Sequence, residues 1–290
     1  MGKHFEVTVK PTIPASKQHI GAFGQYDLVF DWTAFNMPKG SSRLLNTMAL
    51  VRGTNGAAQT NAALDFEIFF AKSINGVAPP SLGTVNSAVT GTGWYNHLIG
   101  MQWLDGTTNN MLSSAGLAYM SMYQGGNRGG GPDVVLTGEP DSGVNVGFDT
   151  VYVAGIQPSS SATFNFSTAV ETTAAEDVDA LSTAIIGGTS ALDNGSGSTA
   201  DCLKKFAVGD ILHAEDDVIL GEIASLTANT ITFRHDGVNQ FHGNGQLLYE
   251  VPDNFAAWQV QNGAGAAGDL ADGDEIYNVH PITLKFSFDH

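Results

Sequence analysis

The sequence predicts an all-β protein: a jelly-roll-like antiparallel β-sandwich with a small inserted β-barrel-like module and one short helix. Apolar and polar residues alternate over many short segments, as in strands with one buried face. Glycine accounts for 35 of 290 residues, about 12% against a usual figure of ~7%, which suits a chain with many tight turns. The first and last predicted strands share one pattern, so we expect both ends of the chain to lie in one sandwich.

The N-terminal part of the chain holds four segments with the period of two that marks strands. Phe5, Val7 and Val9 alternate with polar residues, and Pro11 ends the pattern. The fourth segment alternates most strongly and is the candidate for a central strand. We expect strands at Phe5–Val9, Tyr26–Trp32, Arg43–Arg52 and Leu64–Lys72, with a turn at Asn36–Ser42.

The middle of the chain mixes loops with apolar segments. Residues 73–93 form a polar stretch rich in glycine and proline, and Gly125–Pro132 forms a second loop. Leu112–Gln124 is apolar and rich in methionine, and it is either a pair of strands or a short helix. Further strands are expected at Val144–Ile156 and Ser161–Val170, and the chain closes with a clear strand at Ile282–Phe288.

One segment, Ala174–Ile186, has the features of a helix. Thr173 can cap its first turn, and Glu176 completes a capping box. Two consecutive glycines follow and would end the helix. Its apolar stripe comprises Val178, Leu181 and Ile185. Residues 190–199 have the composition of a flexible linker.

A compact module follows the linker. Within Phe206–Phe233, apolar residues at strand spacing are interrupted by turn residues at Gly209-Asp210, Glu215–Asp217 and Ala228-Asn229. Three or four strands in so few residues predict a small barrel or curled sheet. We therefore divide the chain into a β-sandwich from 1–172 plus 253–290, a helix and linker at 173–199, and an inserted module at 200–252.

Charge is distributed unevenly along the chain. The net charge is −17; residues 1–128 carry 8 basic and 6 acidic side chains, or +2, and residues 129–290 carry 4 and 23, or −19. An acidic half of this kind repels nucleic-acid phosphates, so no nucleic-acid partner is expected. The near-neutral half is the better candidate for a packed contact surface, and the acidic half for solvent exposure.

The sequence contains no pattern for disulfides or membrane insertion. Cys202 is the one cysteine, which excludes an intrachain disulfide and a thiolate metal cluster. The start of the chain lacks an apolar signal core. No apolar run approaches the ~18 residues of a membrane span, so no membrane partner is expected.

Motifs that could carry catalysis fail on their context, and we expect no enzymatic activity, no catalytic residue and no cofactor. His213-Ala-Glu215 matches half of a zinc deaminase signature, but the other half needs two cysteines and the chain has only Cys202. Gly195–Ala200 fits a dinucleotide pattern but follows a linker instead of a strand. Candidate metal ligands are Asp269, Asp272 and Asp274, which fit a Ca²⁺ site or, more simply, a solvated acidic turn.

An aromatic cluster is a candidate contact surface. Trp94, Tyr95 and Trp103 lie close together in the sequence, with His97 between them. They are either core residues or exposed anchors of a protein interface or sugar platform. The methionines Met111, Met120 and Met122 leave the same two alternatives open.

The order of these segments resembles a known group of proteins. YDLVFDW leads through a Pro/Gly/Ser turn to RLLNTMALV, followed by LDFEIFFAKS, a proline-rich loop, GTVNSAV and HLIGMQWLDG. This order is similar to that of head decoration or cement proteins and related structural proteins of tailed-bacteriophage virions. The likeness covers roughly residues 20–105, and 148–156 and 280–289 are in keeping with it. The stretch GDILHAEDDVILGEIASLTANTITF is similar to small β modules that recur in such proteins.

The resemblance implies a non-enzymatic virion protein that binds the outer capsid surface and stabilises it. Its partners would be the major capsid protein or other virion proteins, and it would form a homo-oligomer such as a trimer. It would be made in the host cytoplasm and reside on the capsid exterior. The alternatives are a tail, collar or fibre-associated virion protein, and a glycan-binding adhesin.

Overall fold

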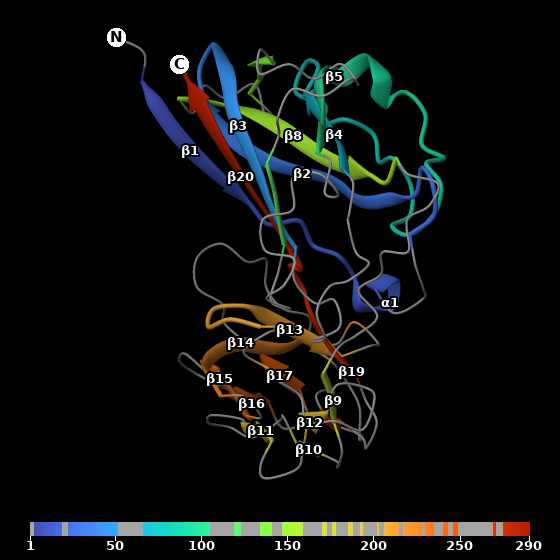
Figure 1. The fold of residues 1–290 in the computed structure, drawn as a ribbon, viewed down its shortest axis with the longest axis vertical. Coiled ribbons are helices and arrows are strands. Elements are labelled where there is room, and N and C mark those ends of the chain that lie inside the picture. Colours follow the sequence, from blue (N-terminus) through green and yellow to red (C-terminus); the bar gives the residue numbers. More distant parts are fainter. Residues whose placement is uncertain are drawn as a thin grey trace.

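The computed structural model has an antiparallel β-sandwich with a further sheet beneath it (Figure 1). The expected all-β sandwich class is confirmed. The structure describes residues 3–18, 23–51, 66–104, 119–122, 134–140, 147–158, 170–172, 176–177, 185–187, 192–193, 202, 206–214, 217, 219–227, 230–234, 240–242, 246–248, 269–270 and 275–290.

One layer of the sandwich, sheet I, is formed by both ends of the chain. β20 lies between β1 and β3, and β3 pairs along its other edge with β6 and β7, all antiparallel. The alternation of Phe286 and Phe288 with polar residues places the apolar side chains of β20 inward, as the burial pattern confirms. The strands of sheet I are β1 (His4–Val9), β3 (Ser41–Val51), β6 (Tyr119–Met122), β7 (Val135–Thr137) and β20 (Ile282–Asp289).

The other layer, sheet II, has the order β2-β8-β4-β5, and its neighbours are also antiparallel. Its strands are β2 (Leu28–Pro38), β4 (Phe66–Lys72), β5 (Leu98–Leu104) and β8 (Phe148–Ile156). β2 is longer than expected, because Asn36–Pro38 continue the strand and the turn is confined to Lys39-Gly40. The 3-10 helix η1 (Trp94–His97) leads directly into β5.

Large apolar side chains from both sheets form the core of the sandwich. Phe286 of sheet I is fully buried, its ring centroid 5.6 Å from that of Phe35 and 5.4 Å from that of Phe70, both in sheet II. The Phe70 contact is edge-on, an arrangement favourable for aromatic pairs. These contacts join the two layers, so the alternating pattern of the sequence is explained by a shared interior.

The polar stretch 73–93 packs over the outer face of sheet II. Leu82 is fully buried there in a small cluster with Leu28 and Ala154. Asp31 holds the loop in place: its Oδ1 accepts the Leu82 N–H at 3.0 Å, and its Oδ2 accepts the Ser81 hydroxyl at 2.5 Å. The covered face explains why Leu28, Val29 and Phe30 are all buried instead of alternating.

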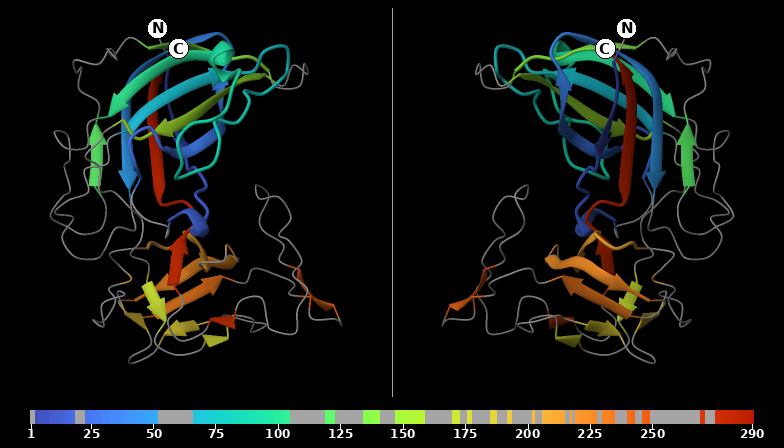
Figure 2. Two further views of the ribbon diagram at one scale, coloured as in Figure 1. Left: turned by 90° about the vertical axis from the view of Figure 1, so that its right-hand side faces the viewer. Right: turned by 90° about the vertical axis from the view of Figure 1, so that its left-hand side faces the viewer.

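Sheet III lies below the sandwich, and both views in Figure 2 show it as a separate layer. Its order is β11-β15-β14-β13-β19-β9-β12. The strands are β9 (Val170–Thr172), β11 (Ile185–Gly187), β12 (Leu192–Asp193), β13 (Ile211–Ala214), β14 (Ile219–Leu226), β15 (Thr230–Arg234) and β19 (Glu275–Asn278). Two-stranded pairs are β10 (Glu176–Asp177) with β18 (Asp269–Leu270), and β16 (Gln240–His242) with β17 (Gln246–Leu248).

The short strands expected within Phe206–Phe233 are present as β13, β14 and β15. Sheet III also takes strands from outside the 200–252 segment, namely β9, β11, β12 and β19. The division of the chain into 1–172 plus 253–290, 173–199 and 200–252 stays a prediction, although the sheet itself extends beyond the last of these ranges.

The predicted helix at Ala174–Ile186 is wrong where the structure describes this range, and residues 174–175 and 178–184 lie outside the described residues. Glu176–Asp177 and Ile185–Gly187 are strands, and the second of these pairs with β15, placing Ile186 opposite Ile231. Strand pairing with a partner distant in the sequence has overridden a local pattern that suits a helix. Within the described residues, α1 (Ala15–Gln18) is a short helix that begins just after Pro14, and Cys202 is also helical.

Several expectations fall wholly or partly outside the described residues. Tyr119–Met122 is a strand, and the rest of Leu112–Gln124 is not described. Within the predicted linker at 190–199, Leu192–Asp193 form a strand instead, and the other residues of that range are not described. The expectations that lie outside concern the loop Gly125–Pro132, most of the strand Ser161–Val170, the motif Gly195–Ala200 and Met111.

Candidate functional site

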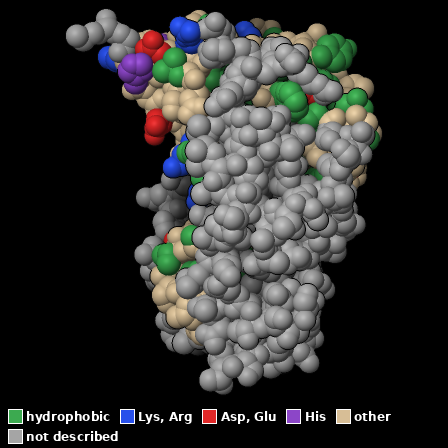
Figure 3. All heavy atoms as spheres, viewed as in Figure 1, with side chains coloured by type: hydrophobic (Ala, Val, Ile, Leu, Met, Phe, Trp, Pro, Cys, Tyr) green, Lys and Arg blue, Asp and Glu red, His purple; other side chains and the backbone are tan. Residues whose placement is uncertain are grey.

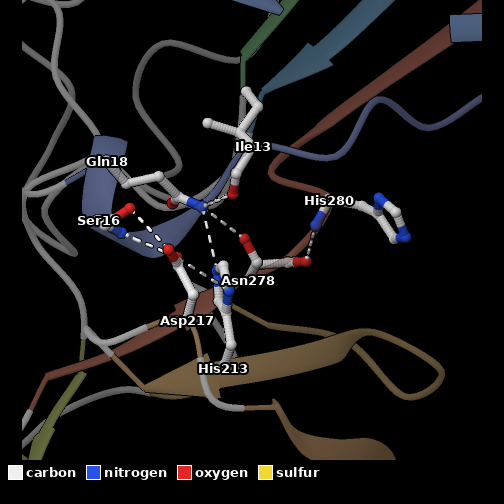
Figure 4. Close-up of polar contacts among 7 residues, drawn as sticks. All are labelled: Ile13, Ser16, Gln18, His213, Asp217, Asn278 and His280. Carbon is white, nitrogen blue, oxygen red and sulfur yellow. Dashed lines mark hydrogen bonds and ion pairs between the residues drawn. The ribbon is translucent and has the colours of Figure 1, made fainter. Parts of the chain in front are cut away.

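The candidate site is a buried polar junction where the N-terminal segment meets sheet III (Figure 4). The N-terminal segment between β1 and β2 supplies Ile13, Ser16 and Gln18; β13 and the turn after it supply His213 and Asp217; β19 and the link to β20 supply Asn278 and His280. The junction therefore joins segments from the beginning, the middle and the end of the chain.

Gln18 is the centre of the junction. Its side chain is 1% exposed, and its amide nitrogen donates to the carbonyl of Ile13 at 2.7 Å and to that of Asn278 at 2.8 Å. The same nitrogen lies 3.4 Å from Nε2 of His213. Because a buried amide without partners costs free energy, these contacts fix α1 against sheet III.

His213 is buried in β13 and packs edge-on against Tyr277, with ring centroids 6.4 Å apart. Burial lowers the pKa of His213 from 6.5 to about 4, although Asp217 and the Asn278 carbonyl act in the opposite direction. The Nδ1 atom lies 3.9 Å from Oδ1 of Asp217. The imidazole is therefore neutral near pH 7, because desolvation outweighs its attraction to the carboxylate.

Asp217 binds the first turn of α1 from the other side of the junction. Its Oδ1 accepts the backbone N–H of Ser16 at 3.0 Å, and its Oδ2 accepts the Ser16 hydroxyl at 2.7 Å. Asp217 has a φ of 69°, in the left-handed region that Asp tolerates better than most residues. The carboxylate satisfies an N–H at the start of a helix that has no acceptor within the helix.

Asn278 and Asp210 extend the network into sheet III. The Asn278 side chain donates to Oδ2 of Asp210 at 2.9 Å and accepts the His280 backbone N–H at 2.8 Å. Oδ2 of Asp210 also accepts the N–H of Ala207 at 2.9 Å. His280 contacts the carbonyl of Pro11 through Nδ1 at 3.1 Å, and burial lowers its pKa below the ordinary value.

The order of contacts in this junction does not suit nucleophilic catalysis. In a catalytic triad, the base accepts the proton of the nucleophile, and the acid orients the base. Here Ser16 donates to Asp217, and Asp217 lies between Ser16 and His213. Within the described ranges, no three His, Cys, Asp or Glu side chains gather where they could hold a metal ion. The geometry supports a structural role, namely holding the N-terminal segment on sheet III.

The aromatic residues predicted as an interface are placed differently from one another. Trp94 is half-buried, donates to the Gly91 carbonyl at 2.9 Å and packs edge-on against Phe69 at 6.1 Å. Tyr95 is 62% exposed and touches Trp94 edge-on at 6.2 Å. Trp103 is half-buried on β5, opposite Glu67 of β4. Trp94 thus serves the packing of the outer face, and Tyr95 is the most exposed of the three.

The other predicted site residues are not tested by the structure. Asp269 lies in β18, paired with Asp177, and Asp272 and Asp274 are outside the described residues. The sequence does not predict the junction, because its residues lie far apart in the chain and show no local motif. The nearest signal was His213, a lone histidine in an apolar strand.

Comparisons with known proteins leave the chain without an assigned family. No family model matches the sequence, and no curated protein matches it. No helix in the described part of the chain is both long and apolar enough to cross a membrane.

Proposed function

We propose that this chain is a non-enzymatic structural protein of a tailed-bacteriophage virion, a decoration or cement protein on the outer surface of the capsid. The observation that carries the proposal is the strand order of the sandwich. The proposal is also supported by the resemblance of the segments over residues 20–105 to such proteins.

The strand order supports a jelly roll. With β6 left aside, sheet I has the order β1-β20-β3-β7, and sheet II has the order β2-β8-β4-β5. Successive strands alternate between the two sheets, except for the neighbours β4 and β5. Two four-stranded sheets connected in this way are typical of jelly rolls, which are common in viral capsid proteins and also in lectins.

In the sequence, the strands of sheet III lie between β8 and β20, which are the last two strands of the sandwich. Residues 129–290, which contain the strands of sheet III, carry the net charge of −19. A decoration protein needs one surface for the capsid and another for solvent, and a strongly acidic part suits the solvent side. We therefore orient sheet III outward and the sandwich toward the capsid.

A decoration protein can bind a capsid stably even when each copy has only a small contact surface. A capsid offers a lattice of identical sites, so an oligomer that binds several of them at once gains avidity without new contacts. The major capsid protein or another virion protein would be the partner, and a homo-oligomer such as a trimer would match local lattice symmetry.

Tyr95 supports a second candidate, a tail, collar or fibre-associated protein or an adhesin that binds host glycans. Tyr95 is 62% exposed and lies beside Trp94, so its ring could stack on a sugar. Tyr95→Ala should then abolish binding to host envelope preparations. Tyr26→Ala, at a residue that is 58% exposed, is the matched control.

The deciding experiment is re-binding of the purified chain to capsids stripped of their accessory proteins. We expect saturable binding and higher resistance of the capsids to heat, with hundreds of copies per particle on a stained gel of intact virions. Binding to host envelope alone, or a handful of copies per virion, would overturn decoration in favour of the second candidate.

A further inference from the structure

The outer edge of β1 is a continuous row of hydrogen-bonding groups. Lys3 and His290 exchange backbone hydrogen bonds of 3.0 Å in both directions, and the β1–β20 register runs from there without a shift. Hydrogen-bonded pairs alternate along an antiparallel ladder. The backbone groups of Phe5, Val7 and Val9 therefore face β20, and those of His4, Glu6 and Thr8 face away from it.

The side chains of β1 alternate in a matching way. His4, Glu6 and Thr8 are exposed. Phe5 and Val7 pack against the sandwich core but are only partly buried, whereas Val9 is buried. The apolar side chains of β1 are therefore partly exposed at this edge of sheet I, and a further strand paired with β1 would bury them.

The edge lacks two of the usual protections against strand addition, a proline and a bulge. Among the described strands, β1 pairs with β20 alone, and β1 contains no proline and no bulge. Natural edge strands are commonly blocked by such features or by inward-pointing charges. Figure 3 shows charged side chains of both signs along the side of the molecule where β1 runs.

We propose that β1 pairs with β1 of a second copy of this chain, antiparallel and about a two-fold axis at Val7. Only registers that place outward-facing groups opposite each other can form hydrogen bonds. Centring the pair on Glu6 would oppose two carboxylates, which is unfavourable. Centring it on Val7 places Glu6 opposite Thr8 of the second copy and Phe5 opposite its Val9, so that the two apolar rows join.

Charge complementarity favours the same register. Exposed Lys10 follows the strand, and with Val7 at the axis it lies diagonally across from Glu6 of the second copy, within reach of a long side chain. The symmetry repeats this pair, because a two-fold contact is isologous. The two copies of sheet I would become one continuous sheet with both sandwiches on the same side.

The first test is a charge exchange, measured as the dissociation constant of self-association by sedimentation. The concentration series should reach about 1 mM, because a contact of one strand pair is small and binds weakly. Glu6→Lys and Lys10→Glu should each weaken the dimer about tenfold, since each opposes like charges twice. The double variant restores opposite charges and should recover the dissociation constant of the unaltered chain.

The second test fixes the register with disulfides. Cys202 is buried, so exposed cysteines can be introduced without a competing thiol. Under oxidation, a mixture of Glu6→Cys and Thr8→Cys chains should form a mixed covalent dimer, because opposed residues of such a pair lie within disulfide range. Each variant alone should remain uncrosslinked.

A chain that is monomeric throughout the series, or a dimer that the charge exchanges leave unchanged, would overturn the proposal. Crosslinking of Glu6→Cys with itself would overturn the register. The proposal does not depend on a virion role, because it concerns self-association of the isolated chain. A two-fold dimer would also differ from the trimer expected from the sequence.

Discussion

The carboxylate of Asp217 accepts hydrogen bonds from both the backbone N–H and the hydroxyl of Ser16, a residue 201 positions earlier in the chain. Through this contact, a turn of sheet III anchors the first turn of α1. Together with Gln18, it ties the N-terminal segment to a sheet built from the second half of the chain. The sandwich and sheet III are thus joined by specific polar contacts as well as by the chain itself.

Replacing Asp217 should loosen this anchor. Asp217→Asn keeps a residue that tolerates the left-handed backbone, but it loses the charge and one acceptor oxygen. We expect the free energy of unfolding to fall by about 1 kcal/mol, since the carboxylate is partly exposed to water. Denaturant unfolding measures the change. Glu6→Gln, on an exposed face of β1, is the control and should have no effect at low protein concentration; an equal loss in both variants would contradict the anchor.

His213 should make stability depend on pH. Its pKa is about 4 in the folded chain against 6.5 in the unfolded one, so the unfolded state binds a proton more readily. The contribution of neutral His213 to the free energy of unfolding is fully present above about pH 6.5 and is lost as the pH falls toward 4. Over that range the shift corresponds to about 3 kcal/mol.

The measurement is the free energy of unfolding at pH 7 and at pH 4 for the unaltered chain and for His213→Gln. The variant has no imidazole to protonate, so its loss between the two pH values should be smaller by about that amount. His4→Gln, whose side chain is 73% exposed, should keep the full loss. Parallel pH profiles for His213→Gln and the unaltered chain would contradict the assignment.

The sandwich could be predicted from the sequence because its signal is local. The alternation in β1, β4 and β20 reflects one apolar face turned to a shared core, and that period survives in the sequence alone. The matching patterns at the two ends predicted one sandwich, and the structure adds that these ends pair directly, with Phe5 opposite Phe288.

Sheet III and the junction could not be predicted in the same way. Ile185 fits a helical stripe with Val178 and Leu181, and only pairing with the distant strand β15 makes Ile185–Gly187 a strand. Ser16 and Asp217 carry no motif, because capping by a remote residue leaves no fixed spacing in the sequence. The strand at Ile185–Gly187 and the contact of Ser16 with Asp217 are both determined by tertiary contacts.

Phe286 should be the most sensitive position of the sandwich core. It is fully buried and touches rings from both sheets, including Phe35 and Phe70 across the interior. Phe286→Ala should reduce the free energy of unfolding by about 4 kcal/mol, the usual range for deleting a buried ring. Lys285→Ala, one position earlier and exposed, is the matched control and should change stability by less than about 0.5 kcal/mol.

Gly91 should be required for the loop that covers sheet II. A Cβ at this position would lie 2.0 Å from the carbonyl oxygen of Ser81 and 2.9 Å from the backbone of Leu82, and backbone atoms cannot give way as a side-chain tip can. Gly91→Ala should therefore displace the loop and cost about 2 kcal/mol, as overpacking of a well-packed region does.

Two measurements check this prediction. Denaturant unfolding gives the loss of stability, and tryptophan fluorescence reports on Trp32, whose Nε1 donates to the Pro80 carbonyl at 2.9 Å, and on Trp94, whose Nε1 donates to the Gly91 carbonyl. A displaced loop would expose both rings and shift their emission to longer wavelength. Thr92→Ala, at the exposed neighbouring residue, should leave both readouts unchanged. If Gly91→Ala matched Thr92→Ala, the loop would not be held against sheet II as closely as these contacts require.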